Sequence, residues 1–118
     1  LAEAQYTRTI ADGIAAADPT AGIAVLGDFN DLPGSPPVLA IQGGSGEALY
    51  DDVAMLAPQE DRWTYDFNGS LELVDHQMAN PVLRARLDPA SVTILHGPMV
   101  EDASDHAPIM ATYLLSAP

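Results

Sequence analysis

The sequence predicts an α/β (α+β) domain with a mixed, largely antiparallel sheet and helices on one of its faces. Residues 2–17 have helical periodicity, and residues 23–27 are an apolar run without polar alternation. Residues 62–67 alternate aromatic and polar side chains before an Asn-Gly pair, which is typical of a hairpin. With 118 residues, 47% of them hydrophobic, and no repeat or linker, the chain predicts one domain over residues 1–118.

The charge balance restricts the class of partner. The chain has 17 acidic residues, four arginines and no lysine, and its formal net charge is −13. Such a surface repels polyanions, which argues against binding nucleic acid through a broad electrostatic contact. It favours the binding of cations where carboxylates converge. The absence of cysteine excludes a disulfide framework and a thiolate site.

The ends of the chain and its hydropathy carry further expectations. No run of 18 apolar residues occurs, so we expect no membrane span. No signal peptide is visible, and a start at Leu1 without Met is what a trimmed piece of a longer chain would have. The composition, free of lysine and cysteine, is compatible with a secreted protein.

The first third predicts helix, strand and helix. Residues 2–17 predict an amphipathic helix whose apolar face carries five residues: Ala2, Tyr6, Ile10, Ile14 and Ala17. The run 23–27 predicts a strand buried on both faces. Gly27 then allows a close turn, so that Asp28 emerges at the carboxyl end of the strand, where α/β sheets bind ligands. Ser35 predicts the cap of a short helix that begins at Pro36.

The middle of the chain predicts a turn, a helix and a hairpin. Residues 42–47 predict a flexible surface turn, and Ala48 to Leu56 predict a short helix. In that helix we expect Leu49, Val53 and Leu56 to be buried and Asp51-Asp52 to be exposed. Asn68-Gly69 predicts a hairpin turn between the aromatic strand and a returning strand that reaches Asp75 and His76.

The last third predicts short elements. Residues 82–87 predict a helical turn that carries Arg84 and Arg86, and residues 91–96 predict a strand. Gly97-Pro98 predicts the start of an acidic loop through Asp102, and residues 109–115 predict a final strand.

Polar clusters beside the predicted strands indicate chemistry. They are Asp28 with Asn30, Asp75 with His76, and Asp105 with His106. A carboxylate that bonds an imidazole fixes its tautomer and raises its basicity. A further carboxylate suits a hard divalent cation, and the asparagine amide can donate to a phosphoryl oxygen. Together these groups suit metal-assisted hydrolysis of a phosphoester.

Each cluster also has a purely structural interpretation. Asp28 could close an ordinary strand in an acidic turn, and Asp105 could cap the following turn. Asp75 is the better signal, because a carboxylate in an apolar strand is costly unless it is paired. His76 points away from Asp75 on a strand, so we expect it to be structural or peripheral, and we expect His96 to serve packing.

Three motifs in order strengthen the functional interpretation, and they cover nearly the whole chain: Gly27-Asp28-Phe29-Asn30-Asp31, Arg62-Trp63-Thr64-Tyr65 leading to Leu73-Val74-Asp75-His76, and Ser104-Asp105-His106-Ala107-Pro108-Ile109. In order and spacing the chain resembles the carboxyl-terminal half of the endonuclease/exonuclease/phosphatase superfamily, which includes deoxyribonucleases and apurinic endonucleases. The sequence around Tyr65 and Asp75 is most similar to that of secreted bacterial members.

The resemblance implies a role for each matched residue. Asp28 would position and deprotonate the attacking water, and Asn30 would hold a phosphate oxygen or the leaving group. His106 would contact the scissile phosphate, and Asp75 would orient His106. Asp105 would help to bind Mg²⁺, Mn²⁺ or Ca²⁺.

Three other matched residues have less specific implied roles. Asp31 would order its loop. Arg62 and Tyr65 would contact the substrate or a loop, with a packing role as the alternative. One departure from the family is mild: Ala79-Asn80 stands where a small hydroxyl residue is common.

The resemblance also implies that half of the domain is absent. The complete domain is a four-layer α/β/β/α sandwich of about twice this length, and its amino-terminal half brings the main metal-binding glutamate. We therefore expect these 118 residues alone to be inactive. We expect the sheet to be covered by helices on one face, near Tyr6, Ile10, Leu39 and Val53. We expect the other face to be open and to bind the missing half or a second copy, through residues such as Ile23, Val25, Trp63, Leu73 and Ile109.

Two function classes remain open. The first is a metal-dependent phosphoesterase, acting on nucleic acid or on a small phosphodiester or phosphomonoester. The second is a non-catalytic binding or interaction domain that retains the fold. The joint presence of Asp28, Asn30, Asp75, Asp105 and His106 favours the first.

Overall fold

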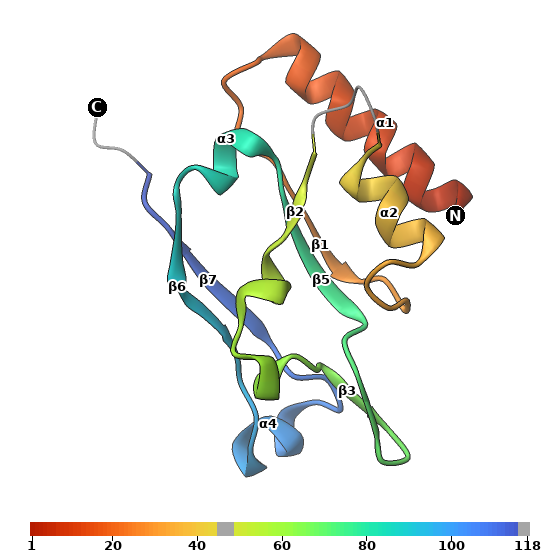
Figure 1. Ribbon diagram of the computed structural model, residues 1–118, viewed down its shortest axis with the longest axis vertical. Helices are drawn as coiled ribbons and strands as arrows, with labels where there is room; N and C mark the ends of the chain where they lie inside the picture. Colours follow the sequence, from red (N-terminus) through yellow and green to blue (C-terminus); the bar gives the residue numbers. More distant parts are fainter. Residues whose placement is uncertain (45–48, 116–118) are drawn as a thin grey trace.

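The computed structural model describes residues 1–44 and 49–115 and confirms a mixed α+β fold with mostly antiparallel sheets (Figure 1). The helices are α1 (Ala2–Ala17), α2 (Pro36–Gln42), α3 (Pro81–Arg84) and α4 (Pro98–Ala103). The strands are β1 (Ala24–Asp28), β2 (Asp51–Asp52), β3 (Tyr65–Phe67), β4 (Ser70–Glu72), β5 (Asp75–Ala79), β6 (Leu87–Ile94) and β7 (Ile109–Tyr113). Two 3-10 helices, η1 (Val53–Leu56) and η2 (Gln59–Asp61), connect β2 to β3.

β5 is the central strand of a three-stranded antiparallel sheet in the order β1-β5-β2. The β1–β5 register places Asp28 directly opposite Asp75. β1 was predicted to be buried on both faces, and this is wrong, because Leu26 is 65% exposed. Leu26 lies on the face of β1 opposite to Val25, which packs on the side of α1 and α2, so these helices do not cover Leu26.

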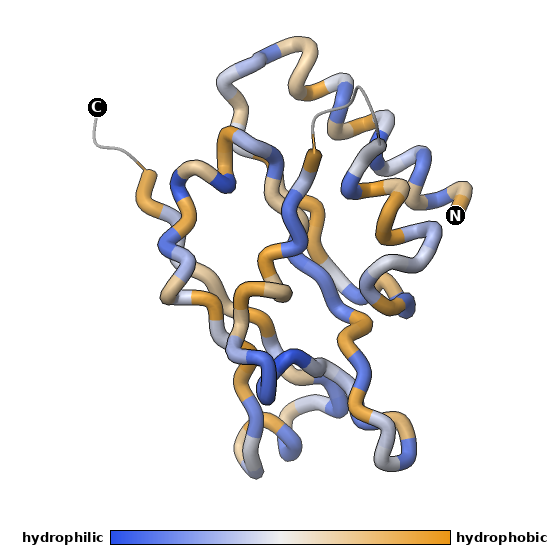
Figure 2. The backbone as a smooth tube through the Cα atoms, in the orientation of Figure 1, coloured by the Kyte–Doolittle hydropathy of each residue, from blue (hydrophilic) through white to orange (hydrophobic). Residues whose placement is uncertain are grey.

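The two faces of β5 pack on different layers. Met78 belongs to a cluster with α1 and α2, which lie together on one side of the sheet (Figure 1). Ala79 points the other way, into a cluster with η1, β6 and β7. Figure 2 shows the hydrophobic stretches of this second cluster in η1 and along β6. Asp75 has the same parity as Ala79 and so lies on the face turned away from α1 and α2.

The predicted bounds of α1 are confirmed, but the predicted buried face is wrong. Tyr6, Ile10 and Ile14 are exposed, while Arg8 and Ala11 are buried. Two contacts account for this rotation of the helix. Alanines allow α1 to approach α2 closely, and the Arg8 guanidinium donates to the carbonyl of Ile41 at 2.7 Å and lies 4.6 Å from the centroid of the Tyr50 ring.

Leu39 and Val53 also depart from the predicted cover of the sheet. Leu39 of α2 is exposed, because Val38 and Ile41 occupy the buried side of that short helix. Val53 is buried, but it packs with β6 in the cluster on the opposite side of the sheet from the two helices. Ser35 is the residue before α2, as predicted, although its side chain makes no capping hydrogen bond.

The segment before β3 differs from the predicted helix over Ala48 to Leu56. The described part is β2 followed by η1, with Leu49 and Leu56 exposed and Asp52 only 7% exposed. Asp52 pairs with His76 inside the fold, a tertiary contact that local periodicity cannot indicate. The turn predicted at residues 42–47 lies largely outside the described residues, as does Ala48.

The hairpin is confirmed, since Asn68 and Gly69 have φ angles of 51° and 92° and join β3 to β4. The helical turn near Arg84 is α3, which Asn80 caps by accepting from the Leu83 amide at 3.0 Å. The segment predicted as an acidic loop forms the short helix α4 instead. Pro98 is the first residue of this helix, a position that proline favours.

The residues predicted on the open sheet face are not the exposed ones. Ile23 and Leu73 are buried, and the other three are half-buried: Val25, Trp63 and Ile109. Leu26 and Met110 are exposed on β1 and β7 instead. None of the helices in the described part of the chain is both long enough and apolar enough to cross a membrane.

Candidate functional site

Asp28 lies where β1 ends, and the local backbone fixes its carboxylate. Gly27 has a φ of 144°, a conformation that residues with a Cβ rarely adopt. Oδ1 of Asp28 accepts a hydrogen bond from the Asn30 amide at 2.8 Å, and Asn30 has a φ of 51°. Asparagine tolerates this left-handed conformation, so the loop turns back and leaves Oδ2 of Asp28 available.

Thr64 holds the strand that carries Asp75. Its side chain is fully buried, and its Oγ1 accepts hydrogen bonds of 3.2 Å from the amides of Val74 and Asp75. The carbonyl of Thr64 accepts from the Ala107 amide at 2.8 Å. One residue therefore fixes the backbones on which both Asp75 and His106 lie. Sequence reasoning assigned it no role, although a hydroxyl between two aromatic residues was the available signal.

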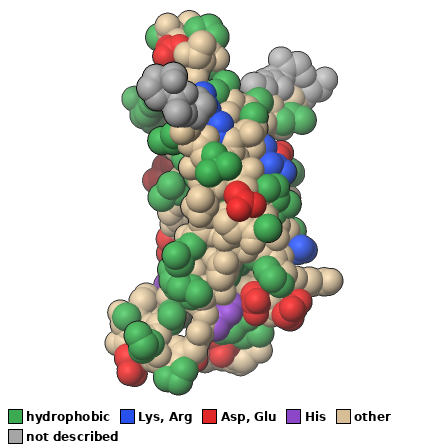
Figure 3. Space-filling model, turned by 90° about the vertical axis from the view of Figure 1, so that its left-hand side faces the viewer, with side chains coloured by type: hydrophobic (Ala, Val, Ile, Leu, Met, Phe, Trp, Pro, Cys, Tyr) green, Lys and Arg blue, Asp and Glu red, His purple; other side chains and the backbone are tan. Residues whose placement is uncertain are grey.

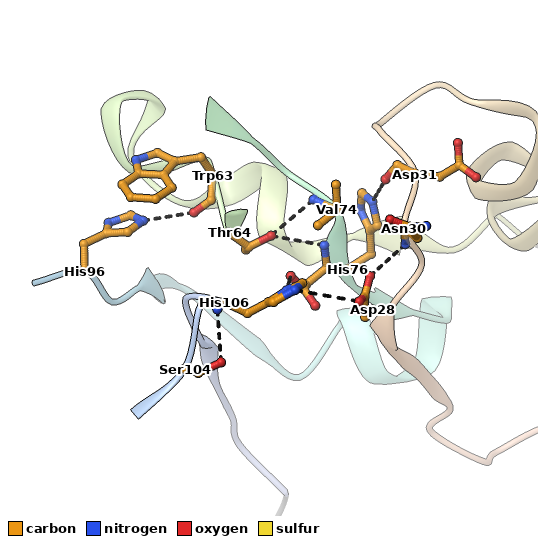
Figure 4. A network of polar contacts seen from close by, with 11 residues as sticks. Asp28, Asn30, Asp31, Trp63, Thr64, Val74, His76, His96, Ser104 and His106 are labelled. Carbon is orange, nitrogen blue, oxygen red and sulfur yellow. Dashed lines mark hydrogen bonds and ion pairs between the residues drawn. The ribbon is translucent and has the colours of Figure 1, made fainter. Parts of the chain in front are cut away.

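His106 lies between two carboxylates (Figure 4). Its Nδ1 is 2.6 Å from Oδ2 of Asp75, and its Nε2 is 3.9 Å from Oδ2 of Asp28. Ser104 Oγ accepts from the His106 amide at 3.0 Å, and the Tyr65 ring centroid is 5.0 Å from the imidazole centroid. The expected pairing of Asp75 with His106 is thus present in the structure.

The same carboxylates shift the pKa of the His106 imidazole. The hydrogen bond that His106 donates to Asp75 raises the pKa of His106, and partial burial opposes this. The negative charges of Asp75, Asp28 and Asp105 raise that pKa further. The imidazole is therefore held in one orientation and stays protonated to a higher pH than an isolated histidine.

Asp28, Asp75 and His106 also satisfy a geometric requirement for metal binding. Each offers a ligand atom, and these atoms all lie within 4.8 Å of one another. Two carboxylates suit Mg²⁺, which typically takes one or two carboxylates and completes its shell with water and phosphate oxygens. Asp105, the residue predicted to bind metal, is not part of this group of three; it is exposed at the rim.

Two cavities border His106. The site cavity, of about 400 Å³, is lined by Asp28, Asn30, Tyr65, Phe67, Glu72, Val74, Asp105 and His106. The Trp63 cavity, of about 290 Å³, lies between β3 and α4. Tyr65, Asp105 and His106 border both. The predicted substrate-binding residues Asn30 and Tyr65 therefore face the space beside the imidazole.

Arg62 and Arg84 lie apart from these cavities, whereas His96 lines the Trp63 cavity. Arg62 lines neither of them, and its Nε donates to the Ala57 carbonyl at 2.6 Å, so it makes a loop contact. Arg84 pairs with Asp51 at 3.0 Å. His96 stacks on Trp63 with ring centroids 3.9 Å apart, in agreement with its predicted packing role.

His76 supports the loop that follows β1 from inside the fold. It is 1% exposed, its Nδ1 is 2.7 Å from Oδ2 of Asp52, and its Nε2 is 2.7 Å from the carbonyl of Asp31. Burial lowers the pKa of His76, but the hydrogen bonds to these two acceptors and the negative charges of Asp52 and Asp75 together outweigh burial, and the net pKa is raised. The predicted structural role of His76 is confirmed, and Asp31 orders the loop through its carbonyl group. Asp52 was not anticipated.

Comparison with models of protein families found no match, and neither the curated proteins nor the solved structures gave one.

Proposed function

We propose that Asp28, Asp75 and His106 form part of the active site of a metal-dependent phosphoesterase, in a chain that is the carboxyl-terminal half of an endonuclease/exonuclease/phosphatase domain. The observation that carries the proposal is one imidazole between two carboxylates, 2.6 Å and 3.9 Å away, at the edge of the site cavity. The order and spacing of the three motifs support the same assignment.

The geometry suggests distinct tasks for the two ring nitrogens of His106. Nδ1 donates to Asp75, and this bond fixes the ring so that Nε2 faces Asp28. The charges that raise the pKa of His106 keep Nε2–H available as a donor to a phosphoryl oxygen. Apart from a share in holding a cation, Asp75 acts on the substrate through His106, so we assign it a positioning role toward that imidazole.

Asp28 and Asn30 would act on the attacking water and on the phosphate. Oδ1 of Asp28 is occupied by the Asn30 amide, which leaves Oδ2 to accept a proton from water. The Asn30 side chain borders the same cavity as His106 and can donate its amide protons to phosphate oxygens.

The donor set fits a hard divalent cation. Asp28 and Asp75 would hold Mg²⁺, or Mn²⁺ or Ca²⁺, with Asp105 at the cavity rim reaching it through water. When bound, the ion would neutralise negative charge that develops on the phosphate. We further propose that additional metal ligands come from an amino-terminal half, so that these 118 residues alone turn over little or no substrate.

The test is hydrolysis of bis(p-nitrophenyl) phosphate by the parent protein, meaning the longest natural chain that contains residues 1–118. We expect turnover with Mg²⁺ or Mn²⁺ and none with excess EDTA. In the 118-residue chain itself, Mn²⁺ should broaden the nuclear magnetic resonance (NMR) signals of Asp28, Asp75 and His106. A parent that binds a phosphodiester without cleaving it would favour the binding-domain alternative.

A further inference from the structure

The Trp63 cavity is built differently from the site cavity beside it. Trp63 lies just before β3, Tyr65 is the first residue of β3, and both line the Trp63 cavity. One ring face of Trp63 stacks on His96 at 3.9 Å with an interplanar angle of 15°, so this aromatic wall is rigid. At about 290 Å³, the cavity is close in size to the smallest ligand pockets.

Part of the lining is acidic. Glu101 of α4, Asp105 and Asp66 of β3 all line the cavity. Its lining contains no lysine or arginine. Figure 3 shows a histidine at about the height of α4 among acidic and apolar side chains, with the basic side chains on that face lying above it. The cavity therefore combines aromatic rings with three carboxylates, and among the described residues that line it only the imidazoles of His96 and His106 can carry a positive charge.

We propose that the Trp63 cavity binds an organic cation, such as a quaternary ammonium or a primary amine. Aromatic faces attract such cations through the ring quadrupole, and the charges of Glu101 and Asp105 add Coulomb attraction. His106 borders both cavities, so one ligand can place its cation beside Trp63 and its phosphate beside His106. Resting on the proposed function, this identifies the substrate class as phosphodiesters with a cationic substituent.

The alternative occupants fit less well. A nucleobase also stacks on aromatic rings and can donate hydrogen bonds to carboxylates, but it is uncharged and so lacks the Coulomb attraction that a cation gains from Glu101 and Asp105. A polynucleotide would bring further phosphates toward Glu101 and Asp105 on a chain whose net charge is −13. A neutral apolar group would leave the two carboxylates unused.

The experiment uses the 118-residue chain and its single tryptophan, whose indole N–H gives one signal in a ¹⁵N NMR spectrum. Choline is titrated against 3,3-dimethyl-1-butanol, a neutral molecule of the same shape, and against adenosine. We expect choline to shift the Trp63 indole signal saturably and the other two to leave it nearly unchanged. Equal shifts with dimethylbutanol, or shifts with adenosine alone, would overturn the proposal.

A pair of variants tests whether the carboxylates that line the Trp63 cavity contribute to choline binding. Glu101→Gln should weaken choline binding by up to about fivefold, as expected for a partly exposed charge contact. Glu3→Gln, which removes one carboxylate from the distant amino-terminal turn of α1, is the control and should bind as the unaltered chain does. Equal affinity in all three proteins contradicts the assignment of Glu101.

These titrations need no catalytic turnover, so they separate the two claims. A parent that cleaves bis(p-nitrophenyl) phosphate while choline leaves Trp63 unshifted refutes the cation site alone. Choline binding in a protein whose parent never cleaves phosphodiesters refutes the phosphoesterase and keeps the cation site.

Discussion

Oδ2 of Asp75 lies 2.6 Å from Nδ1 of His106, although the two residues are 31 positions apart in the chain. β5 presents Asp75 on the face turned away from α1 and α2, and the segment after α4 brings His106 to it. Thr64 accepts the amide of Asp75 and bonds the backbone next to His106, so the pair is fixed from both sides. The ring therefore has one orientation, with Nε2 toward Asp28.

Replacing Asp75 by Asn should lower the pKa of His106, because the hydrogen bond that His106 donates to this carboxylate is the main cause of its raised pKa. An NMR titration of the imidazole in metal-free buffer measures the change. Asp105→Asn is the control and should lower the pKa by less, since that carboxylate acts only through its charge. In the parent, Asp75→Asn should reduce turnover by about 10²- to 10⁴-fold. An unchanged pKa in the Asp75 variant would contradict the positioning role.

Thr64→Val should destabilise the fold by about 1–3 kcal/mol, because it leaves the amides of Val74 and Asp75 buried without an acceptor. Urea unfolding measures the loss. Thr64→Ser keeps the hydroxyl and should lose less. Equal stability of the valine variant and the unaltered chain would show that these two hydrogen bonds contribute nothing net.

His76 should make stability depend on pH. Its folded-state pKa is raised, so its contribution is fully present below its unfolded pKa of about 6.5 and is lost as pH rises through the folded value. The difference in unfolding free energy between the metal-free chain and its His76→Gln variant should therefore be larger near pH 5.5 than near pH 8.5. A difference that grows with pH would contradict a protonated His76 between Asp52 and the Asp31 carbonyl.

The 118-residue chain, which we propose is half of a larger domain, should self-associate. Leu26 is 65% exposed on the face of β1 turned away from α1 and α2, and contiguous apolar surface of several hundred Å² marks an interaction site. Static light scattering should report a mass above the monomer, and Leu26→Gln should reduce it. A monomeric mass at all concentrations would contradict this prediction.

Local signals were sufficient for part of the fold. Asn68-Gly69 gave the hairpin because both residues accept positive φ, and the length of α1 followed from its periodicity. The buried face of α1 could not be predicted, because alanine packing and the Arg8 contacts to α2 and Tyr50 decide it. β2 was mistaken for a helix because its burial depends on Asp52 meeting His76 from a distant strand.

The candidate site, like the fold, could be predicted from the sequence only in part. Asp28, Asp75 and His106 could be chosen from the sequence because each is a polar residue at the end of an apolar segment or within one. Their mutual distances depend on strand register and on Thr64, which no local pattern indicates. Asp105 is not in the group that Asp28, Asp75 and His106 form, because adjacent residues in an extended segment point in different directions, and its part in metal binding stays a prediction.

The central claim is that Asp28 and His106 act together on a phosphodiester. Its most direct test is the rate of bis(p-nitrophenyl) phosphate hydrolysis by the parent protein in Mg²⁺, for Asp28→Asn, His106→Ala and the double variant, with Glu3→Gln as control. We predict a fall of about 10²-fold or more in each single variant, little further loss in the double variant, and no change in the control. Near-normal turnover in Asp28→Asn or His106→Ala would contradict the claim.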